Sequence, residues 1–184
     1  MSPDNYTILI AKLDEFIRKF YRNRLMRGGI FFITLLTLFF LIVTLTEYFG
    51  RFETGVRAVI FYSFIALSGL ILWRLILTPL FRLMKIGKVI SHEEAASIIG
   101  RHFPEIGDKL LNTLQLKNLQ DKGQAEYPAE LIRASIDQKI EKLRPIPFNL
   151  AINIRQNLRY LRYALPPVVI VILILILSPR VITE

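Results

Sequence analysis

The uncharged run GGIFFITLLTLFFLIVTLT (residues 28–46) decides the fold class of this chain. A helix needs about 20 apolar residues to cross the ~30 Å hydrocarbon core of a bilayer. A second run, AVIFYSFIALSGLILWRLILTPLF (residues 58–81), carries one charge, Arg74, and a third, YALPPVVIVILILILSP (residues 163–179), carries none. The sequence therefore predicts an all-α membrane protein with three transmembrane helices, at about 28–48, 58–81 and 163–179.

The first run does not resemble a cleavable signal peptide. Some 27 residues precede it, it is longer than a signal-peptide core, and no A-x-A-like cleavage site follows it. We expect an uncleaved anchor. The chain has no cysteine, so it can form neither a disulfide bond nor a thiol-based site.

The net charge of +9 is concentrated near the ends of the predicted spans. Residues 1–27 hold six Lys/Arg, and residues 82–162 hold fourteen against nine acids. Such a distribution follows the positive-inside rule, and juxtamembrane bases attract anionic lipid. We expect lipid contact from the bases that flank the spans, namely Arg22, Arg24, Arg27, Arg82, Lys85, Lys88, Arg159 and Arg162. The charge thus indicates a membrane topology and not nucleic-acid binding.

This topology predicts a cytoplasmic N-terminus, an external hairpin and a cytoplasmic domain at 82–162. The third span then leads outward to a periplasmic segment that begins at 180–184. Residues 1–27 form an amphipathic helix with Leu9, Leu13, Phe16, Ile17 and Phe20 at helical spacing. This helix can lie among the lipid headgroups or pack on the cytoplasmic domain.

The cytoplasmic domain is predicted to be a small helical bundle. Ser91 and Glu94 match a capping box, and Phe103-Pro104 predicts a corner between helices. Four helices are expected, at about 92–102, 106–120, 128–144 and 151–163, and Pro166-Pro167 is expected near the start of the third span. The expected apolar faces are Ala95, Ile98, Ile99 and His102; Leu110, Leu111 and Leu114; Leu131, Ile132, Ile136, Ile140 and Leu143; and Ile154, Leu158 and Leu161.

The His92-Glu93 pair does not indicate a zinc protease. The zincin motif H-E-x-x-H needs a second histidine one turn on, where this chain has Ala96. His102 is ten residues away, nearly three turns, so a single helix cannot bring both rings to one metal. We expect no metal, no cofactor and no catalytic residue, and hence no enzyme.

Arg74 is the one charge inside the three apolar runs, next to Trp73. It either reaches the membrane interface by snorkelling or pairs with a partner chain inside the membrane. No Asp, Glu or His occurs in the three apolar runs (28–46, 58–81 and 163–179), which argues against a proton relay or ion pathway formed by this chain alone.

The run SHEEAASIIGRHFPEIGDKLLNTLQL (residues 91–116) resembles a segment of a bacterial, Bacteroidetes-type inner-membrane protein family of unknown function. Ala95, Ala96, Ile99, Gly100, Phe103, Pro104, Asp108, Lys109, Leu110, Leu111 and Asn112 carry the resemblance, and SIDQKIEKLRPIPF and RYLRYALPP extend it. It implies an inner-membrane protein that continues after the third span into a large coiled-coil-rich periplasmic region. The chain would then be the membrane-anchoring N-terminal part.

Three functions remain open at the level of sequence. The first is a non-enzymatic inner-membrane scaffold that joins a cytoplasmic domain to a periplasmic extension. The second is a subunit of a transporter or channel, and the third is a membrane-bound regulator. The expected partners are the lipid bilayer, other membrane proteins or a second copy, and a cytoplasmic ATPase, which the resemblance suggests.

Overall fold

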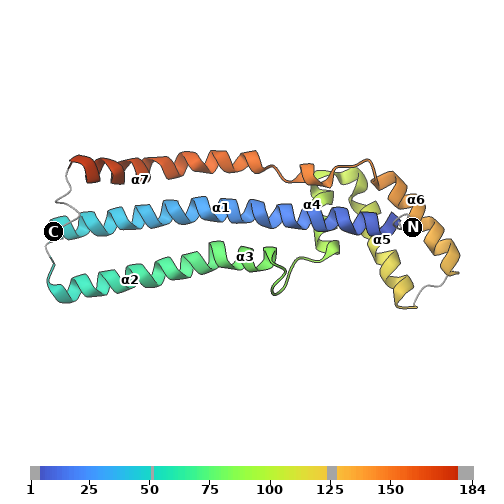
Figure 1. Ribbon diagram of the computed structural model, residues 1–184, viewed down its shortest axis with the longest axis horizontal. Coiled ribbons are helices and arrows are strands. Elements are labelled where there is room, and N and C mark those ends of the chain that lie inside the picture. The colour runs from blue at the N-terminus through green and yellow to red at the C-terminus, as the bar shows by residue number, and fades with distance from the viewer. Residues whose placement is uncertain (1–4, 51, 124–127, 178–184) are drawn as a thin grey trace. The chain divides into compact units, whose positions relative to one another are not determined.

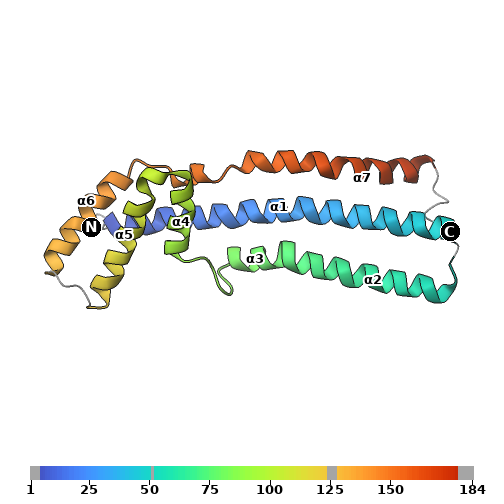
Figure 2. The same ribbon diagram turned by 180° about the vertical axis from the view of Figure 1, so that it is seen from behind.

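The computed structural model describes residues 5–50, 52–123 and 128–177, and every regular element in these ranges is helical (Figures 1 and 2). Three helical stretches are long and apolar enough to cross a membrane: Asn5–Gly50, Thr54–Leu83 and Phe148–Ile174. The predicted helical class and the predicted number of spans are thereby confirmed. The expected periplasmic segment, 180–184, lies outside the described residues.

The chain forms two compact units. One, the helical unit, comprises residues 1–20 and 88–153, and the other, the membrane unit, comprises residues 21–87 and 154–184. Helix α1 (Asn5–Gly50) is a single helix of 46 residues, so it contributes to both units. The sequence predicted a separate N-terminal helix before the first span. The two are continuous because no proline interrupts the stretch between them.

The helical unit contains the first turns of α1, together with α4 (His92–His102), α5 (Pro104–Asp121), α6 (Ala129–Leu143) and a 3₁₀ turn (Phe148–Ala151). The buried apolar side chains of this unit are Leu9, Leu13, Phe16, Ile17, Ala95, Ala96, Ile99, Ile106, Leu110, Leu114, Ile132, Ile136, Ile140, Leu143, Phe148 and Ile152. The first turns of α1 therefore pack on the domain, and their apolar face is not available to lipid headgroups.

Polar contacts also hold the first turns of α1 within the helical unit. Asp14 Oδ1 lies 2.9 Å from His92 Nε2 on α4. Lys19 Nζ donates to the Asn149 carbonyl at 2.7 Å, and Asn149 Nδ2 donates to Glu15 Oε1 at 2.6 Å. The helix thus contacts both α4 and the 3₁₀ turn by hydrogen bonds from its polar sides.

The corner between α4 and α5 forms as predicted. The Ser91 hydroxyl accepts from the Glu94 amide at 3.1 Å, and the Glu94 carboxylate accepts from the Ser91 amide at 3.2 Å, which completes the capping box. Gly100 and Gly107 approach closely on the two sides of the corner at Phe103, since a Cβ added to Gly100 would lie 2.8 Å from the Gly107 Cα. Only glycine permits this approach of the two helices.

Several predicted core positions in the helical unit are wrong. His102 is exposed and its ring lies edge-on to Phe103, while Leu131 is 63 % exposed. His102 lies in the last turn of α4 and Leu131 in the first turn of α6. At these ends of the helices the two side chains do not point toward the core. Thr113, which the apolar pattern missed, is fully buried because its hydroxyl donates to the Lys109 carbonyl at 2.6 Å.

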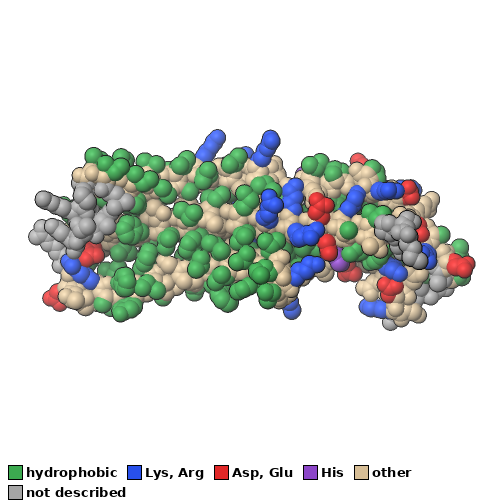
Figure 3. All heavy atoms as spheres, in the orientation of Figure 1, with side chains coloured by type: hydrophobic (Ala, Val, Ile, Leu, Met, Phe, Trp, Pro, Cys, Tyr) green, Lys and Arg blue, Asp and Glu red, His purple; other side chains and the backbone are tan. Residues whose placement is uncertain are grey.

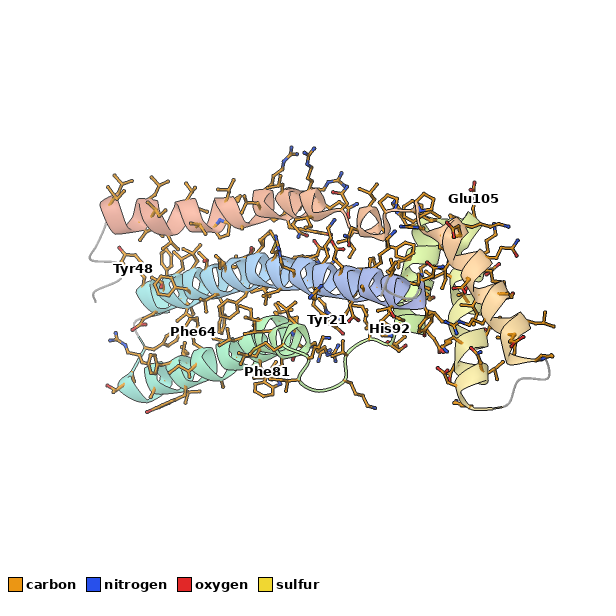
Figure 4. All side chains as sticks on the ribbon, turned by 45° about the vertical axis from the view of Figure 1, so that its right-hand side comes forward. Tyr21, Tyr48, Phe64, Phe81, His92 and Glu105 are labelled. Atoms are coloured by element: carbon orange, nitrogen blue, oxygen red, sulfur yellow. The ribbon has the colours of Figure 1, made fainter. Side chains whose placement is uncertain are left out.

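The membrane unit consists of the remainder of α1, α2 (Thr54–Leu72), a π-helical turn (Trp73–Leu77), α3 (Thr78–Leu83) and α7 (Asn157–Leu177). Helix α1 lies between α2 and α7 (Figures 1 and 2). The Phe39 ring stacks on Phe64 of α2 with centroids 5.3 Å apart, and Phe31 contacts Tyr160 of α7 at 5.2 Å. Phe64 is labelled in Figure 4.

A proline explains the π-helical turn in the second span. Pro79 has no N–H, so the Leu75 carbonyl lacks its α-helical donor, and the proline ring would clash with that carbonyl in a regular helix. The turn widens there, and the Thr78 N–H bonds to the Trp73 carbonyl, five residues back. Gly28 of α1 sits against this turn, because an added Cβ would overlap the Leu75 carbonyl oxygen.

The entry to the third span differs from the prediction. Residues 151–163 do not form one helix; a 3₁₀ turn (Ile154–Gln156) is followed directly by α7, which begins at Asn157. Pro166 and Pro167 therefore lie inside a helix and not at its start. Leu158 and Leu161, predicted to pack in the bundle, are 64 % and 44 % exposed because they belong to the membrane helix.

Two adjacent glycines test the contact between α1 and the π-helical turn. Gly28→Ala should destabilise the protein by about 1–3 kcal/mol, since the new methyl group overpacks against the backbone of Leu75. Gly29→Ala is the matched control, because nothing lies within 4 Å of its added Cβ. Thermal unfolding in detergent, followed by circular dichroism, should show a lower midpoint for Gly28→Ala alone. Equal midpoints would contradict the contact.

Candidate functional site: a basic belt on the membrane unit

Three contacts set the register of the membrane helices. Asn157 Nδ2, at the start of α7, donates to Asn23 Oδ1 of α1 at 2.7 Å. The Arg27 guanidinium lies over the Tyr160 ring at 5.7 Å, and Gly28 meets the carbonyl of Leu75. Because a helix rises about 1.5 Å per residue, any position on α2, α3 or α7 can be assigned a level along α1.

Most of the described basic side chains of the membrane unit fall within a narrow band on this scale, whereas Arg57 lies near the opposite end. Arg159 and Arg162 are level with α1 positions near 25 and 28, Arg82 with position 21, and Arg74 with position 29. We define the basic belt as Arg22, Arg24, Arg27, Arg74, Arg82, Lys85, Arg159 and Arg162. The belt residues that lie on helices are spread over about 12 Å along the axis of α1. All eight are exposed except Arg82, which is half-buried. Lys88, also predicted to contact lipid, belongs to the helical unit.

The opposite end of the membrane unit is charged differently. Arg57 Nε lies 3.0 Å from Glu47 Oε1 and donates to the Phe52 carbonyl at 3.0 Å. Arg27 and Glu47 are twenty residues apart on α1, which corresponds to about 30 Å and matches the hydrocarbon core of a bilayer. Tyr48, labelled in Figure 4, follows Glu47 at one end of this segment, and Tyr21 lies six residues before Arg27.

The belt has no acidic counterpart among the described residues of its own unit. The acids in that part of the chain, Glu47 and Glu53, both lie at the opposite end. On the face shown in Figure 3, apolar side chains cover the three long helices, and Lys and Arg side chains stand where this apolar surface ends. The belt is therefore a concentration of positive charge at one rim of an apolar surface.

Arg74 belongs to this rim and does not lie deep in the span. Its level, next to Leu75 and Gly28, is where the uncharged run of α1 begins. Trp73 is 59 % exposed, and its ring lies edge-on to Phe81 at 6.1 Å. An arginine and a tryptophan at this depth are typical of a membrane interface, so the register favours the snorkelling alternative for Arg74.

The two asparagines that join α1 to α7 were missed at the level of sequence. Asn157 is 4 % exposed, and its amide also reaches the Asn23 carbonyl at 3.5 Å. Together with Arg27 and Phe31 against Tyr160, these residues hold the start of α7 on α1. Each asparagine lies in a basic, polar stretch, and nothing in the local pattern shows that the two meet across 134 residues.

The first residue of the His92-Glu93 pair has a partner within the helical unit. No group of three or more His, Cys, Asp or Glu side chains that could hold a metal occurs among the described residues. His92 pairs with Asp14, and Glu94 serves the capping box. The motif thus has a structural explanation.

No protein-family model matches this chain, and no curated protein or solved structure matches it. The belt, the ion pair at the opposite rim and the helical unit are therefore the features on which a function can be based.

The asparagine pair predicts a specific double-mutant outcome. Asn157→Leu should destabilise the protein by about 0.5–2 kcal/mol, since it leaves the half-buried Asn23 amide oxygen without its donor. Asn23→Leu/Asn157→Leu should recover much of this loss, because neither apolar side chain needs a hydrogen bond. Thermal unfolding of the four proteins measures the coupling. Strictly additive effects would show that the two side chains do not interact.

Proposed function

We propose that this chain is a non-enzymatic anchor and scaffold of the bacterial inner membrane. In this proposal it holds a helical domain at the cytoplasmic face, assembles there with other membrane proteins or with itself, and leads into a periplasmic extension. The observation that carries the proposal is the double use of α1. Leu13 and Phe16 of this helix are fully buried in the helical unit, and residues 28–46 of the same helix are uncharged and apolar.

This use of α1 favours an anchor over a loosely attached domain. Removing Asn5–Phe20 from the helical unit would expose Leu9, Leu13, Phe16 and Ile17 to water. Burial of one such side chain stabilises a fold by about 1.5–3 kcal/mol. The helical unit therefore includes part of the membrane helix in its core. The same proposal includes membership of the bacterial inner-membrane family that residues 91–116 resemble. Such membership accords with an anchor.

The positions of the bases support a cytoplasmic location for the helical unit. The belt lies at the end of the membrane unit where α1 leaves the helical unit and where α3 leads back to it. Lysine and arginine are retained preferentially on the cytoplasmic side of inner-membrane proteins.

Small residues on α2 support assembly with further helices. The structure buries no residue of α2, and nothing lies within 4 Å of a Cβ added at Gly55 or Gly69. Ala66 is also exposed, whereas Phe64 faces α1. Small side chains let membrane helices approach closely, and a second copy or another membrane protein can use this face.

The absence of native cysteine permits a direct test of the topology. Glu53→Cys, in the hairpin, should react with a membrane-impermeant maleimide from the periplasmic side of spheroplasts. Gln138→Cys, on an exposed position of α6, should react only after the membrane is permeabilised. Reaction of Gln138→Cys in intact spheroplasts would place the helical unit outside and contradict the proposal.

Photo-cross-linking tests the assembly. p-Benzoylphenylalanine in place of Tyr62, which is 69 % exposed on α2, should give adducts with a second protein or a second copy in native membranes. The same group in place of Phe64, which contacts Phe39, is the matched control and should react within the chain. If Tyr62 gives no protein adduct and the chain is a monomer in mild detergent, the scaffold proposal fails.

A further inference from the structure

Two belt arginines, Arg159 and Arg162, lie on the side of α7 that faces away from α1. Asn157 and Ala164, which are buried, and Tyr160, which contacts Phe31, mark the side toward α1. At 100° per residue, Arg159 and Arg162 lie roughly opposite to that side. Both are exposed, and neither makes a hydrogen bond or an ion pair with a described residue.

The two arginines form a compact cationic pair. Residues three apart on a helix have Cβ atoms about 5–6 Å apart, and like charges at this spacing destabilise a helix unless an anion lies between them. The described acids of this unit, Glu47 and Glu53, are at its other end. The anion that balances the pair therefore comes from outside this unit.

Toward the C-terminus from the pair, exposed apolar side chains continue along α7, and we call them the apolar track. Leu165, Val169 and Ile172 are 52 %, 46 % and 48 % exposed and follow Arg162 at spacings of three and four residues. From Arg162 to Ile172 the helix rises about 15 Å. The surface thus combines a cationic head with an apolar track of roughly the length of a lipid acyl chain.

The depth of the pair separates a lipid from an acidic protein as its occupant. Arg159 and Arg162 are level with α1 positions near 25 and 28, at the start of the uncharged run of that helix. At that depth lipid phosphates are within reach of guanidinium groups, whereas Leu165, Val169 and Ile172 lie in hydrocarbon. A soluble acidic partner could reach the arginines but not the apolar track.

We propose that Arg159 and Arg162 bind the phosphate of an anionic phospholipid whose acyl chain lies along Leu165, Val169 and Ile172. Guanidinium groups bind phosphate oxygens in a bidentate manner, which favours arginine over lysine at such a site. The inference requires that α7 is inserted in a bilayer, but it does not depend on the assembly with partner proteins proposed above.

The single tryptophan of the chain makes a clean fluorescence test available. Trp73→Phe removes the native reporter, and Tyr163→Trp introduces one on α7 one turn from Arg159, at a side chain that is 67 % exposed. The full chain is reconstituted in vesicles of phosphatidylcholine with added phosphatidylglycerol. Bromine on the acyl chains of one lipid or the other then quenches the reporter in proportion to the local share of that lipid.

The reporter protein should prefer phosphatidylglycerol over phosphatidylcholine by roughly fivefold or more. Arg159→Gln/Arg162→Gln should bring this ratio close to one. Arg22→Gln/Arg24→Gln removes the same charge from the belt on α1 and should retain most of the preference. Arg159→Lys/Arg162→Lys should fall between the two, because lysine keeps the charge and loses the bidentate geometry.

Three results would overturn the inference. One is a ratio near one in the reporter protein. Another is an equal loss in both glutamine double variants, which would assign the preference to the charge of the belt as a whole. The third is an unchanged ratio in Arg159→Gln/Arg162→Gln, combined with the loss, in this variant, of a protein that is photo-cross-linked to the chain in native membranes. This result would assign the pair to an acidic partner. Failure of either lipid to quench the reporter would show that α7 is not inserted, which also contradicts the anchor proposal.

Discussion

A bilayer excludes charged side chains from a layer about 30 Å thick, and the charges of the membrane unit respect this limit. On α1, an uninterrupted apolar segment lies between Arg27 and Glu47, and its length matches the thickness of this layer. At the Glu47 end, Arg57 forms an ion pair with it, so that rim carries compensated charge. At the Arg27 end the bases of three helices reach the same level without an acid among the described residues of the unit. The two rims of the unit therefore differ in charge.

The contact between Gly28 and Leu75 shows how one proline influences the packing of two spans. Pro79 removes a backbone donor, and the helix widens into a π turn. The Leu75 carbonyl, without its α-helical donor, then faces Gly28 of α1. A polar backbone group without a donor is costly in hydrocarbon, and a Cα–H of glycine is among the few groups small enough to approach it. Gly28 and Pro79, far apart in sequence, are therefore explained by one interaction.

The parts of this structure that sequence predicts are those set by local or compositional rules. Three apolar runs are long enough to span a membrane, and the Ser91–Glu94 capping box depends on four consecutive residues. The contact of Asn23 with Asn157 depends instead on which helices become neighbours, which no local pattern contains. The depth of Arg74 was also ambiguous, because it depends on the register of α2 against α1. Periodicity likewise overestimated burial at helix ends such as His102.

The first turns of α1 are held in the core of the helical unit. Leu13 and Phe16 are fully buried there, and Asp14 pairs with His92 of α4. Close-packed interiors resist rotation of such a helix about its axis, because a displaced side chain leaves a cavity on one side and an overlap on the other. The orientation of residues 5–20 within this unit is therefore set by packing. The apolar periodicity of this stretch predicts that packing but does not predict its hydrogen-bond partners.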